Sequence, residues 1–328
     1  MKKLLSAGLC LSMFLLSGCQ GQPQDTTLTI TDQAGREVTF EEPCQTAASG
    51  YYITTTIMIG LQQQDKLTGI EMKPETRPIY AKAAEEILDL PQLGNKKMFN
   101  VEECAKADPD VVFLPVSLGS YVEELEALDI PVVLLEPETA DDFEEAVEII
   151  GKVMGCEDKV DEYKQYEEDL LEKYELDEVE EEPTVYFAGS DLLTCATDDM
   201  YQGEILSYAQ ADNAIDAEGS SWVNIDIETL LAANPDYVFI EAGSLSADDF
   251  KNDARVQDLQ AVQNDHVYVF PSTLETWDTP SLSSCLGKLW AASILHPELV
   301  SMDDVEAESV AFYEQFYGFT PEAQDLAL

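Results

Sequence analysis

The chain has 328 residues, which is enough for two domains of ordinary size, and its 45% hydrophobic content excludes wholesale disorder. It carries 66 acidic against 17 basic residues, a formal net charge of −49. Because phosphate groups are bound by Lys and Arg, this balance argues against a nucleic-acid partner and against electrostatic adhesion to anionic lipid. We expect most of the carboxylates to form a solvated surface.

The N-terminus has the pattern of a secretion signal. Two lysines precede an apolar run from Leu4 to Leu16, which is shorter than the roughly 20 residues of a membrane-spanning helix. The tetrapeptide LSGC that ends at Cys19 resembles the signal of bacterial lipoproteins, in which the Cys thiol is diacylated and becomes the new N-terminus. We therefore predict a signal peptide at residues 1–18, a lipid anchor at Cys19 on the extracytoplasmic face of the cell membrane, and a tether at 19–27. An ordinary secretory signal with an incidental cysteine is the alternative.

The chain has seven cysteines. Cys10 lies within the signal and Cys19 is the predicted lipid anchor, which leaves five. They are odd in number, widely spaced and without a CxxC motif, so they fit neither a zinc pattern nor a disulfide framework. We expect buried small hydrophobic side chains, with one disulfide left open, at Cys44, Cys104, Cys156, Cys195 and Cys285.

The region 28–155 is predicted to be an N-terminal α/β lobe. Leu28 to Phe40 alternate as a hairpin with Gly35 at the turn. Alternation of strands with helices favours a parallel sheet. Strands are expected at residues 47–52, 66–70, 111–114 and 131–135, and helices at 54–61, 79–88, 121–128 and 139–155.

A connecting helix is predicted at residues 156–182. From Glu157 to Leu176, apolar residues recur at three- and four-residue steps, and neither Gly nor Pro interrupts the pattern before Pro183. About 20 residues at 1.5 Å each span roughly 30 Å, the width of a small domain. The pattern alone is that of a surface helix, but its place between two α/β regions indicates a strut.

The region 183–328 is predicted to be a second α/β lobe. Its strands are expected at 184–188, 237–240 and 267–270, and its helices near 202–209, 283–295 and 305–317. The loop at 274–280 contains Trp277, which we expect to be exposed.

One short unit occurs in both lobes. Glu102 lies seven residues before Pro109, Glu228 lies seven before Pro235, and each Pro precedes an Asp and a β-rich run. A repeat spaced this far apart indicates two similar lobes. We therefore predict an α/β fold of two Rossmann-like lobes, each a parallel-rich sheet flanked by helices, joined by one long α-helix.

Ligands of parallel α/β sheets bind at the carboxyl ends of the strands, so the cleft between the lobes is the expected site. Aromatic side chains there could stack on a planar or bulky ligand, although ordinary core packing is the alternative for each of them. The candidates at or near strand ends and in polar loops are Tyr51, Tyr52, Ser117, Asp191, Tyr201, Glu241 and Trp277.

The order of these features resembles a known family. The lipoprotein signal, the opening DQAGREV from Asp32, the paired helix–Pro-Asp–strand units, the single connecting helix and a closing segment from Trp277 to Glu298 together resemble the substrate-binding lipoproteins of ABC importers for iron–siderophore, haem and cobalamin. The resemblance implies a bilobed receptor with little hinge motion, whose partners are an ABC permease and ATPase complex. It also implies that one Glu of each lobe docks on permease arginines, at Glu102 and Glu228. First-turn glutamates favoured by the helix dipole are the alternative.

The residues also limit the ligand. The two histidines, His266 and His296, lie away from the expected cleft, which disfavours a bare-metal site or a His-ligated haem. We predict no metal site and no cofactor of the protein's own. Arginine is scarce, so only Arg77 could grip an anion, and only if its loop folds over the cleft. This favours slightly a bulky, weakly charged metal complex such as a corrinoid or a neutral siderophore, since backbone amides can also bind anions.

An enzyme is the less favoured class. The chain lacks GxSxG, HExxH and P-loop motifs, and chance carboxylate pairs carry little weight among 66 acids. The alternative from another class is a cell-surface glycan-processing or adhesive lipoprotein.

Overall fold

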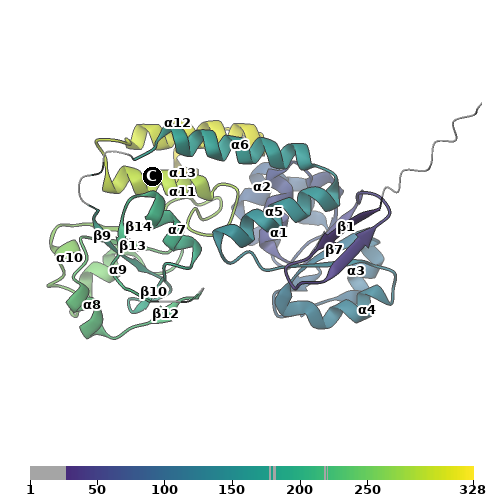
Figure 1. Cartoon of the computed structure of the whole chain (residues 1–328), viewed down its shortest axis with the longest axis horizontal. Helices are drawn as coiled ribbons and strands as arrows, with labels where there is room; N and C mark the ends of the chain where they lie inside the picture. The colour runs from purple at the N-terminus through teal and green to yellow at the C-terminus, as the bar shows by residue number, and fades with distance from the viewer. Residues whose placement is uncertain (1–26, 177–178, 180–181, 218, 220) are drawn as a thin grey trace, which may run out of the picture.

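The computed structural model describes residues 27–176, 179, 182–217, 219 and 221–328, so Cys19 and the predicted signal peptide lie outside the described residues. The chain forms two lobes bridged along one side by helices (Figure 1). We call residues 28–155 the N-lobe and residues 183–328 the C-lobe. Within the described residues, no helix is both long enough and apolar enough to cross a bilayer.

The N-lobe is built on a four-stranded sheet in the order β4-β3-β7-β8, and all its pairs are parallel. Every residue of β7 and β8 is buried, as expected for a parallel sheet covered by helices on both faces. The strands are β3 (Ala47–Ser49), β4 (Leu67–Gly69), β7 (Val111–Pro115) and β8 (Val132–Leu135), and the helices are α1 (Tyr52–Gly60), α2 (Pro78–Ala83), α3 (Val101–Ala107), α4 (Val122–Glu126) and α5 (Ala140–Met154).

Two small hairpins complete the N-lobe. The predicted opening hairpin is present as β1 (Leu28–Thr31) and β2 (Glu37–Phe40), with Gly35 at a φ of 77°. A second hairpin, β5 (Gly94–Asn95) with β6 (Met98–Phe99), was not predicted. Its two strands are joined by the two-residue turn Lys96-Lys97, which contains neither Gly nor Pro, so no turn signal is visible in the sequence there.

The C-lobe has a separate, mixed sheet in the order β12-β10-β9-β13-β14, with β11 beside β9. Its centre, β9 (Thr184–Ala188), β13 (Tyr237–Ile240) and β14 (Val267–Val269), is parallel, and β10 (Thr194–Cys195) and β12 (Val223–Asn224) form an antiparallel edge. The remaining elements are β11 (Asp212–Asn213), α7 (Tyr201–Tyr208), α8 (Ile227–Ala233), α9 (Ala247–Asn252), α10 (Gln260–Gln263), α11 (Ser284–Leu295), α12 (Met302–Phe312), the π-helical turn η5 (Tyr313–Tyr317) and α13 (Ala323–Leu326).

The connecting helix α6 spans Glu157–Lys173, which is shorter than the 156–182 expected. The sequence after Lys173 is strongly acidic, and negative charge at a helix C-terminus is unfavourable, which accounts for the early end.

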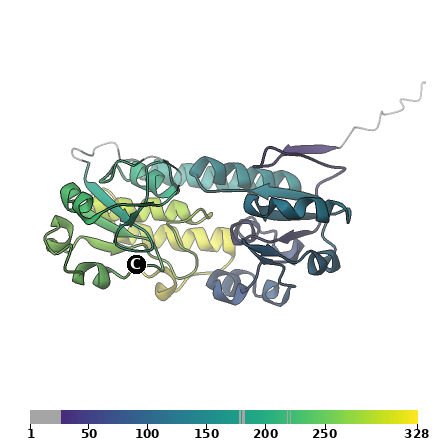
Figure 2. The same ribbon diagram turned by 90° about the horizontal axis from the view of Figure 1, so that it is seen from below.

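The strut is reinforced by a second link between the lobes. Tyr166 of α6 packs against Phe312 and Phe316, with ring centroids 5.7 and 5.2 Å apart. Gln62 of the N-lobe donates to the carbonyl of Gln315 at 3.0 Å. Seen from below, the C-terminal helices reach the N-lobe (Figure 2). The two lobes have separate sheets, but one continuous buried cluster contains residues of both lobes and joins them.

All five cysteines in the described part of the chain are buried and free, which confirms the prediction of buried small side chains. Burial raises the pKa of the Cys44 and Cys104 thiols to about 12.

Candidate functional site in the interlobe cleft

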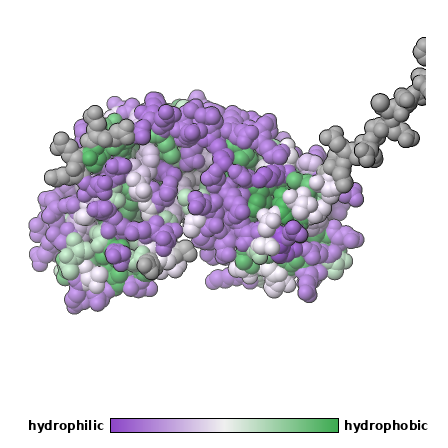
Figure 3. All heavy atoms as spheres, viewed as in Figure 1, coloured by the Kyte–Doolittle hydropathy of each residue, from purple (hydrophilic) through white to green (hydrophobic). Residues whose placement is uncertain are grey.

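A cavity of about 630 Å³ lies between the lobes. The surface is hydrophilic over most of the face seen in Figure 3 and is hollowed between the lobes. The cavity is reached by segments that follow β3 and β4 in the N-lobe and β13 and β14 in the C-lobe, so the carboxyl ends of both sheets meet there, as expected. Its lining consists of Tyr52, Thr56, Thr76–Ile79, Ala242, Gly243, Val269–Thr276, Thr279–Ser281 and Ala327.

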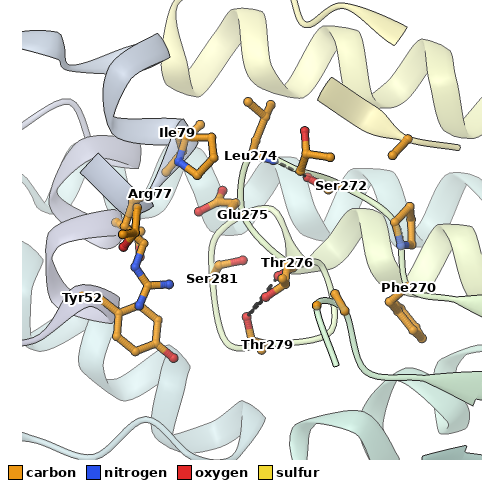
Figure 4. A pocket seen from close by; sticks show the side chains of 18 of the residues that line it. Tyr52, Arg77, Ile79, Phe270, Ser272, Leu274, Glu275, Thr276, Thr279 and Ser281 are labelled. Atoms are coloured by element: carbon orange, nitrogen blue, oxygen red, sulfur yellow. Dashed lines mark hydrogen bonds between the residues drawn. The ribbon is translucent and has the colours of Figure 1, made fainter. Parts of the chain in front are cut away.

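Arg77 and Tyr52 form the N-lobe wall. The Arg77 guanidinium lies over the Tyr52 ring, 4.0 Å from its centroid (Figure 4). Arg77 precedes Pro78, the first residue of α2, and has the extended backbone that a residue before proline prefers. The other two arginines, Arg36 and Arg255, are paired with carboxylates, whereas Arg77 has no ion pair with any residue that the structure describes. Its donors are therefore available to a ligand.

A buried acid supports this wall from behind. Glu71 accepts hydrogen bonds from Tyr80 Oη and from Thr55 Oγ1, both at 2.7 Å. Burial raises the pKa of Glu71, while these two hydrogen bonds and the charge of Arg77 act in the opposite direction. The network ties α1 to α2 and so fixes Tyr52 relative to Arg77.

The C-lobe wall is rich in hydroxyls and carboxyls. Thr276 and Thr279 are joined through their hydroxyls at 2.7 Å. Glu275 Oε1 accepts a hydrogen bond from Tyr317 Oη at 2.7 Å, and burial raises the pKa of Glu275. The wall is held from below by α13, since the Leu326 carbonyl accepts from Ser272 N at 2.7 Å.

Asp278 lies directly beneath this wall. Its side chain is fully buried, and Oδ2 accepts from Ala242 N at 2.9 Å, while Oδ1 has no hydrogen-bond partner among the described residues. Burial raises the pKa of Asp278 to about 7, and the neighbouring Glu241 acts in the same direction. The carboxyl is therefore poised to hold a proton on Oδ1 near neutral pH.

Of the predicted residues, one lines the cavity and two are next to lining residues in the sequence. Tyr52 lines it. Tyr51 lies behind Tyr52, edge to face, with ring centroids 5.4 Å apart. Glu241 is partly buried beside Ala242, and burial raises the pKa of its carboxyl.

Ser117 and Asp191 lie elsewhere. Ser117 is exposed and donates to the Lys96 carbonyl at 3.3 Å. Asp191 is exposed and accepts from Leu193 N at 2.9 Å and from Thr194 Oγ1 at 3.0 Å. Both residues follow strands, but their side chains hydrogen-bond to neighbouring segments and do not line the cavity.

Two predicted residues are core residues. Trp277 is fully buried, not exposed, and its Nε1 donates to Tyr313 Oη at 3.0 Å. Tyr201 is buried against Phe143 and bonded to Ser284 Oγ, and it borders a second cavity beneath α6. From the sequence alone, large aromatic rings beside polar loops resemble ligand contacts, because the elements that cover them lie far away in the sequence.

Sequence analysis missed the hydroxyl groups that line the cavity. Ser272, Thr276, Thr279 and Ser281 lie in one loop after β14. Their density in a stretch that follows a strand is a signal that could have identified them.

Metal ligation is not supported by the side chains. Within the described residues, no group of three or more His, Cys, Asp or Glu could hold a metal ion. His296 is buried with Nε2 bonded to the Ala209 carbonyl at 2.9 Å, and His266 is stacked on Tyr237.

Glu102 and Glu228 lie in the first turns of α3 and α8 and are both exposed. The Glu102 carboxylate is 3.0 Å from Lys106 Nζ. Exposure makes both acids accessible to a partner, although a first-turn glutamate needs no partner to be favourable.

Several solved structures share the fold of this chain. A periplasmic solute-binding protein from Veillonella parvula matches with a TM-score of 0.78 and 20% identity, covering 92% of this chain and 97% of that one. The molybdate-bound protein MolA of Haemophilus influenzae matches with a TM-score of 0.76 and 22% identity, covering 90% and 99%. CeuE of Helicobacter pylori, in a nickel–histidine complex, matches with a TM-score of 0.72 and 18% identity, covering 91% and 97%.

Sequence comparison agrees. MolA of H. influenzae, a molybdate-binding protein, is 23% identical over 317 residues, covering 88% of this chain and 90% of that protein. The family model described as periplasmic binding protein matches residues 48–274, well over half of the chain. The chain therefore belongs to the periplasmic binding protein family, whose members similar to it bind solutes for transport.

Proposed function

We propose that this chain is the extracytoplasmic solute-binding subunit of an ABC importer and that it captures a metal chelate bearing at least one anionic group in the interlobe cavity. The observation that carries the proposal is the Arg77 guanidinium, which has no ion pair among the described residues and is stacked on Tyr52 inside the cavity. Planar guanidinium groups bind carboxylate and other oxyanions through two parallel hydrogen bonds.

The size of the cavity favours a chelate over a small ion. Sites for drug-sized molecules have volumes of about 300–1,000 Å³, and the cavity has about 630 Å³. A siderophore, a haem or a corrinoid uses such a space, whereas a tetrahedral oxyanion leaves most of it empty. The scarcity of arginine favoured a weakly charged ligand only if Arg77 lay away from the cleft. Arg77 lines the cavity, so an anionic chelate is now favoured. Molybdate is the second candidate, favoured by the similarity to MolA over most of the chain.

The same proposal assigns the remaining contacts. Cys19 carries the lipid that holds the chain to the bilayer, and Glu102 and Glu228 dock on the permease, one from each lobe. The lobes are joined by α6 and by a shared buried cluster, which supports docking at a fixed separation.

Ligand binding is tested by a thermal-shift and calorimetric screen of the 25–328 fragment against ferric siderophores, haem, corrinoids and molybdate. A ligand at 100 times its dissociation constant stabilises the native state by about 2.7 kcal/mol, which such a screen detects easily. Replacement Arg77→Ala should weaken the bound anionic ligand about 10- to 100-fold, since a hydrogen bond to a charged group contributes about 1.5–3 kcal/mol.

The matched control is Arg255→Ala, which removes an exposed arginine paired with Asp253 and should leave affinity unchanged. Binding of no metal complex or oxyanion would contradict the proposal. Chemical consumption of a glycan would instead support the alternative of a glycan-processing lipoprotein, and reversible glycan binding would support the adhesive one.

A further inference from the structure

The unpaired cations of the described chain gather at one place. Of the lysines and arginines that the structure describes, ten form ion pairs with carboxylates, and Lys66 donates to the Met154 carbonyl. The cationic groups left without a carboxylate or carbonyl partner are those of Lys73, Arg77, Lys96 and Lys97. We call these four residues the basic rim.

The fold brings the rim together from two segments. Lys73 precedes the 3₁₀ turn Pro74–Thr76, and Arg77 follows it, so the two are about one turn apart. Lys96 and Lys97 form the turn of the β5–β6 hairpin. The segments are joined where Lys73 N donates to Gln92 Oε1 at 3.1 Å and Met72 N donates to the Gly94 carbonyl at 2.5 Å.

The segments that carry the rim leave the edge of the N-lobe sheet that borders the cavity, and Arg77 lines the cavity itself. The segment with Lys73 and Arg77 follows β4, and Ser117, which follows β7, holds the hairpin through the Lys96 carbonyl. Parallel strands end at the same edge of a sheet, and Arg77 at that edge lines the cavity (Figure 4). Ser117, a predicted ligand residue, thus supports the hairpin that carries Lys96 and Lys97.

Charge makes this arrangement unusual for the chain. A protein with a formal charge of −49 repels an approaching anion, and its abundant carboxylates should pair with any lysine they can reach. In the stretches 72–77 and 95–98, Glu75 is the only acid. The two segments therefore carry four cationic side chains against one acid, on a chain that is otherwise strongly acidic.

The rim also carries apolar surface. Met72 and Met98 flank its segments and are 41% and 58% exposed. Methionine side chains are flexible and polarizable, and they are common on surfaces that accept ligands of irregular shape. Lysines beside methionines fit a ligand that combines anionic groups with apolar faces.

We propose that the basic rim captures and steers the anionic metal chelate into the interlobe cavity, with Lys73, Lys96 and Lys97 governing the rate of association and Arg77 the lifetime of the complex. The inference rests on the proposed function. Opposite charges that remain exposed act mainly on the association rate, whereas buried charged contacts act on dissociation.

Stopped-flow binding by the full-length chain in detergent tests this, with ferric citrate, a ferric tricatecholate and haem as anionic probes and an uncharged ferric trihydroxamate as the neutral probe. The variant Lys73→Glu/Lys96→Glu/Lys97→Glu should lower the association rate constant of the anionic probe about tenfold at low ionic strength. The difference from wild type should shrink at 0.5 M salt, and the dissociation rate should change less than twofold. The neutral probe should be unaffected.

The control variant Lys152→Glu/Lys159→Glu/Lys173→Glu makes the same change in net charge on α5 and α6, away from the cleft, and should lower the rate much less. Equal slowing by both variants, or none by either, overturns the inference. Normal association by the rim variant combined with lost stimulation of the importer's ATPase also overturns it and makes the rim a permease contact. If no anionic probe binds the wild-type chain, the proposed function fails first and the inference with it.

Discussion

The two lobes share one structural frame and differ in the chemistry of the edges that face the cleft. At the N-lobe edge, four cationic side chains have no ion pair with any described carboxylate, and one of them, Arg77, lines the cavity. At the C-lobe edge, the carboxyls of Glu241, Asp278 and Glu275 are wholly or partly buried, and burial raises the pKa of each. The N-lobe wall therefore presents the Arg77 guanidinium to the cavity, whereas the C-lobe wall contains Glu275 and has Glu241 and Asp278 close behind it. The comparison shows that the repeated frame positions the loops, and the loops determine what can bind.

The shared frame repeats in atomic detail. In the N-lobe, Asp110 Oδ2 accepts from Thr46 N at 2.8 Å, and Asp110 N donates to Thr46 Oγ1 at 3.0 Å. In the C-lobe, Asp236 Oδ2 accepts from Thr184 N at 3.0 Å, and Asp236 N donates to Thr184 Oγ1 at 3.1 Å. Each Asp thus clamps the start of the strand beside its own, which explains why Pro-Asp recurs in the sequence.

The helix before each clamp is built in the same way. Asn100 and Asp226 cap the N-termini of α3 and α8 by accepting from the backbone three residues on. Asp108 and Asn234 end them in the left-handed conformation, with φ values of 49° and 43°. Glu102 and Glu228 therefore occupy equivalent positions in the two lobes.

The largest expected effect comes from breaking this equivalence at the predicted docking sites. The double variant Glu102→Lys/Glu228→Lys should abolish solute uptake by cells while leaving ligand affinity unchanged. Exposed ion pairs are individually weak, so docking depends on both lobes engaging together, and each single variant should reduce uptake only in part. Transport assays with a labelled chelate, paired with calorimetry, measure the two quantities.

The control for docking is Asp161→Lys/Glu172→Lys, which makes the same change in charge on the exposed side of α6. This variant should transport normally. Normal uptake by the Glu102/Glu228 variant would show that the glutamates serve only their helix termini.

The next largest effect tests the buried support of the C-lobe wall. Trp277→Ala removes a fully buried indole, and large-to-small changes of buried aromatic residues cost about 3–5 kcal/mol. Trp277→Phe should cost less, because one aromatic ring is kept, although part of the buried volume and the hydrogen bond to Tyr313 are lost. Urea unfolding measures both, and a loss below about 1 kcal/mol for Trp277→Ala would show that the indole is not a support of the loop.

Trp277 also shows where sequence reasoning stops. Element order, the paired units and the position of the cleft follow from periodicity and from Pro and Gly punctuation, which are local signals. The burial of Trp277 depends on Tyr313 in a π-helical turn that lies 36 residues further along the chain. The unpaired state of Arg77 depends likewise on where every carboxylate lies. Such facts are tertiary, so the sequence identified Arg77 only as a conditional candidate.

A smaller effect is expected in the pH dependence of stability, which two acids of the C-lobe, Asp278 and Asp191, should influence in opposite directions. The pKa of Asp278 is raised from 3.8 to about 7, so between these values the native state keeps a proton that the unfolded state has lost. Stability should therefore fall as pH rises from about 4 to 7 and level off above, by a contribution of a few kcal/mol. Asp278→Asn should remove this fall, as measured by urea unfolding across the pH range.

Asp191 supplies the matched contrast. Hydrogen bonds from Leu193 N and Thr194 Oγ1 lower its pKa below 3.8, so its contribution is present above that value and is lost as pH falls. Asp191→Asn should thus lower stability above about pH 4, where the wild-type chain has this contribution, and the stabilities of the two chains should converge as the pH falls. Identical pH profiles for wild type and Asp278→Asn would mean that Asp278 is ionised in the native state.

The smallest expected effect comes from removing an ion pair between the lobes, which tests whether this contact influences ligand affinity. Lys82 of α2 pairs with Asp325 of α13 at 2.9 Å, a direct ion pair between the lobes. Lys82 is exposed to solvent, whereas Asp325 is held independently by Glu322 N at 2.9 Å, so the pair should add little to a junction that is mainly apolar. Lys82→Met should lower the melting temperature by less than about 2 °C and change chelate affinity less than twofold. Lys152→Met, which breaks a pair within one helix, is the control. A larger loss of affinity for Lys82→Met alone would mean that this ion pair, and not the buried cluster, sets the width of the cleft.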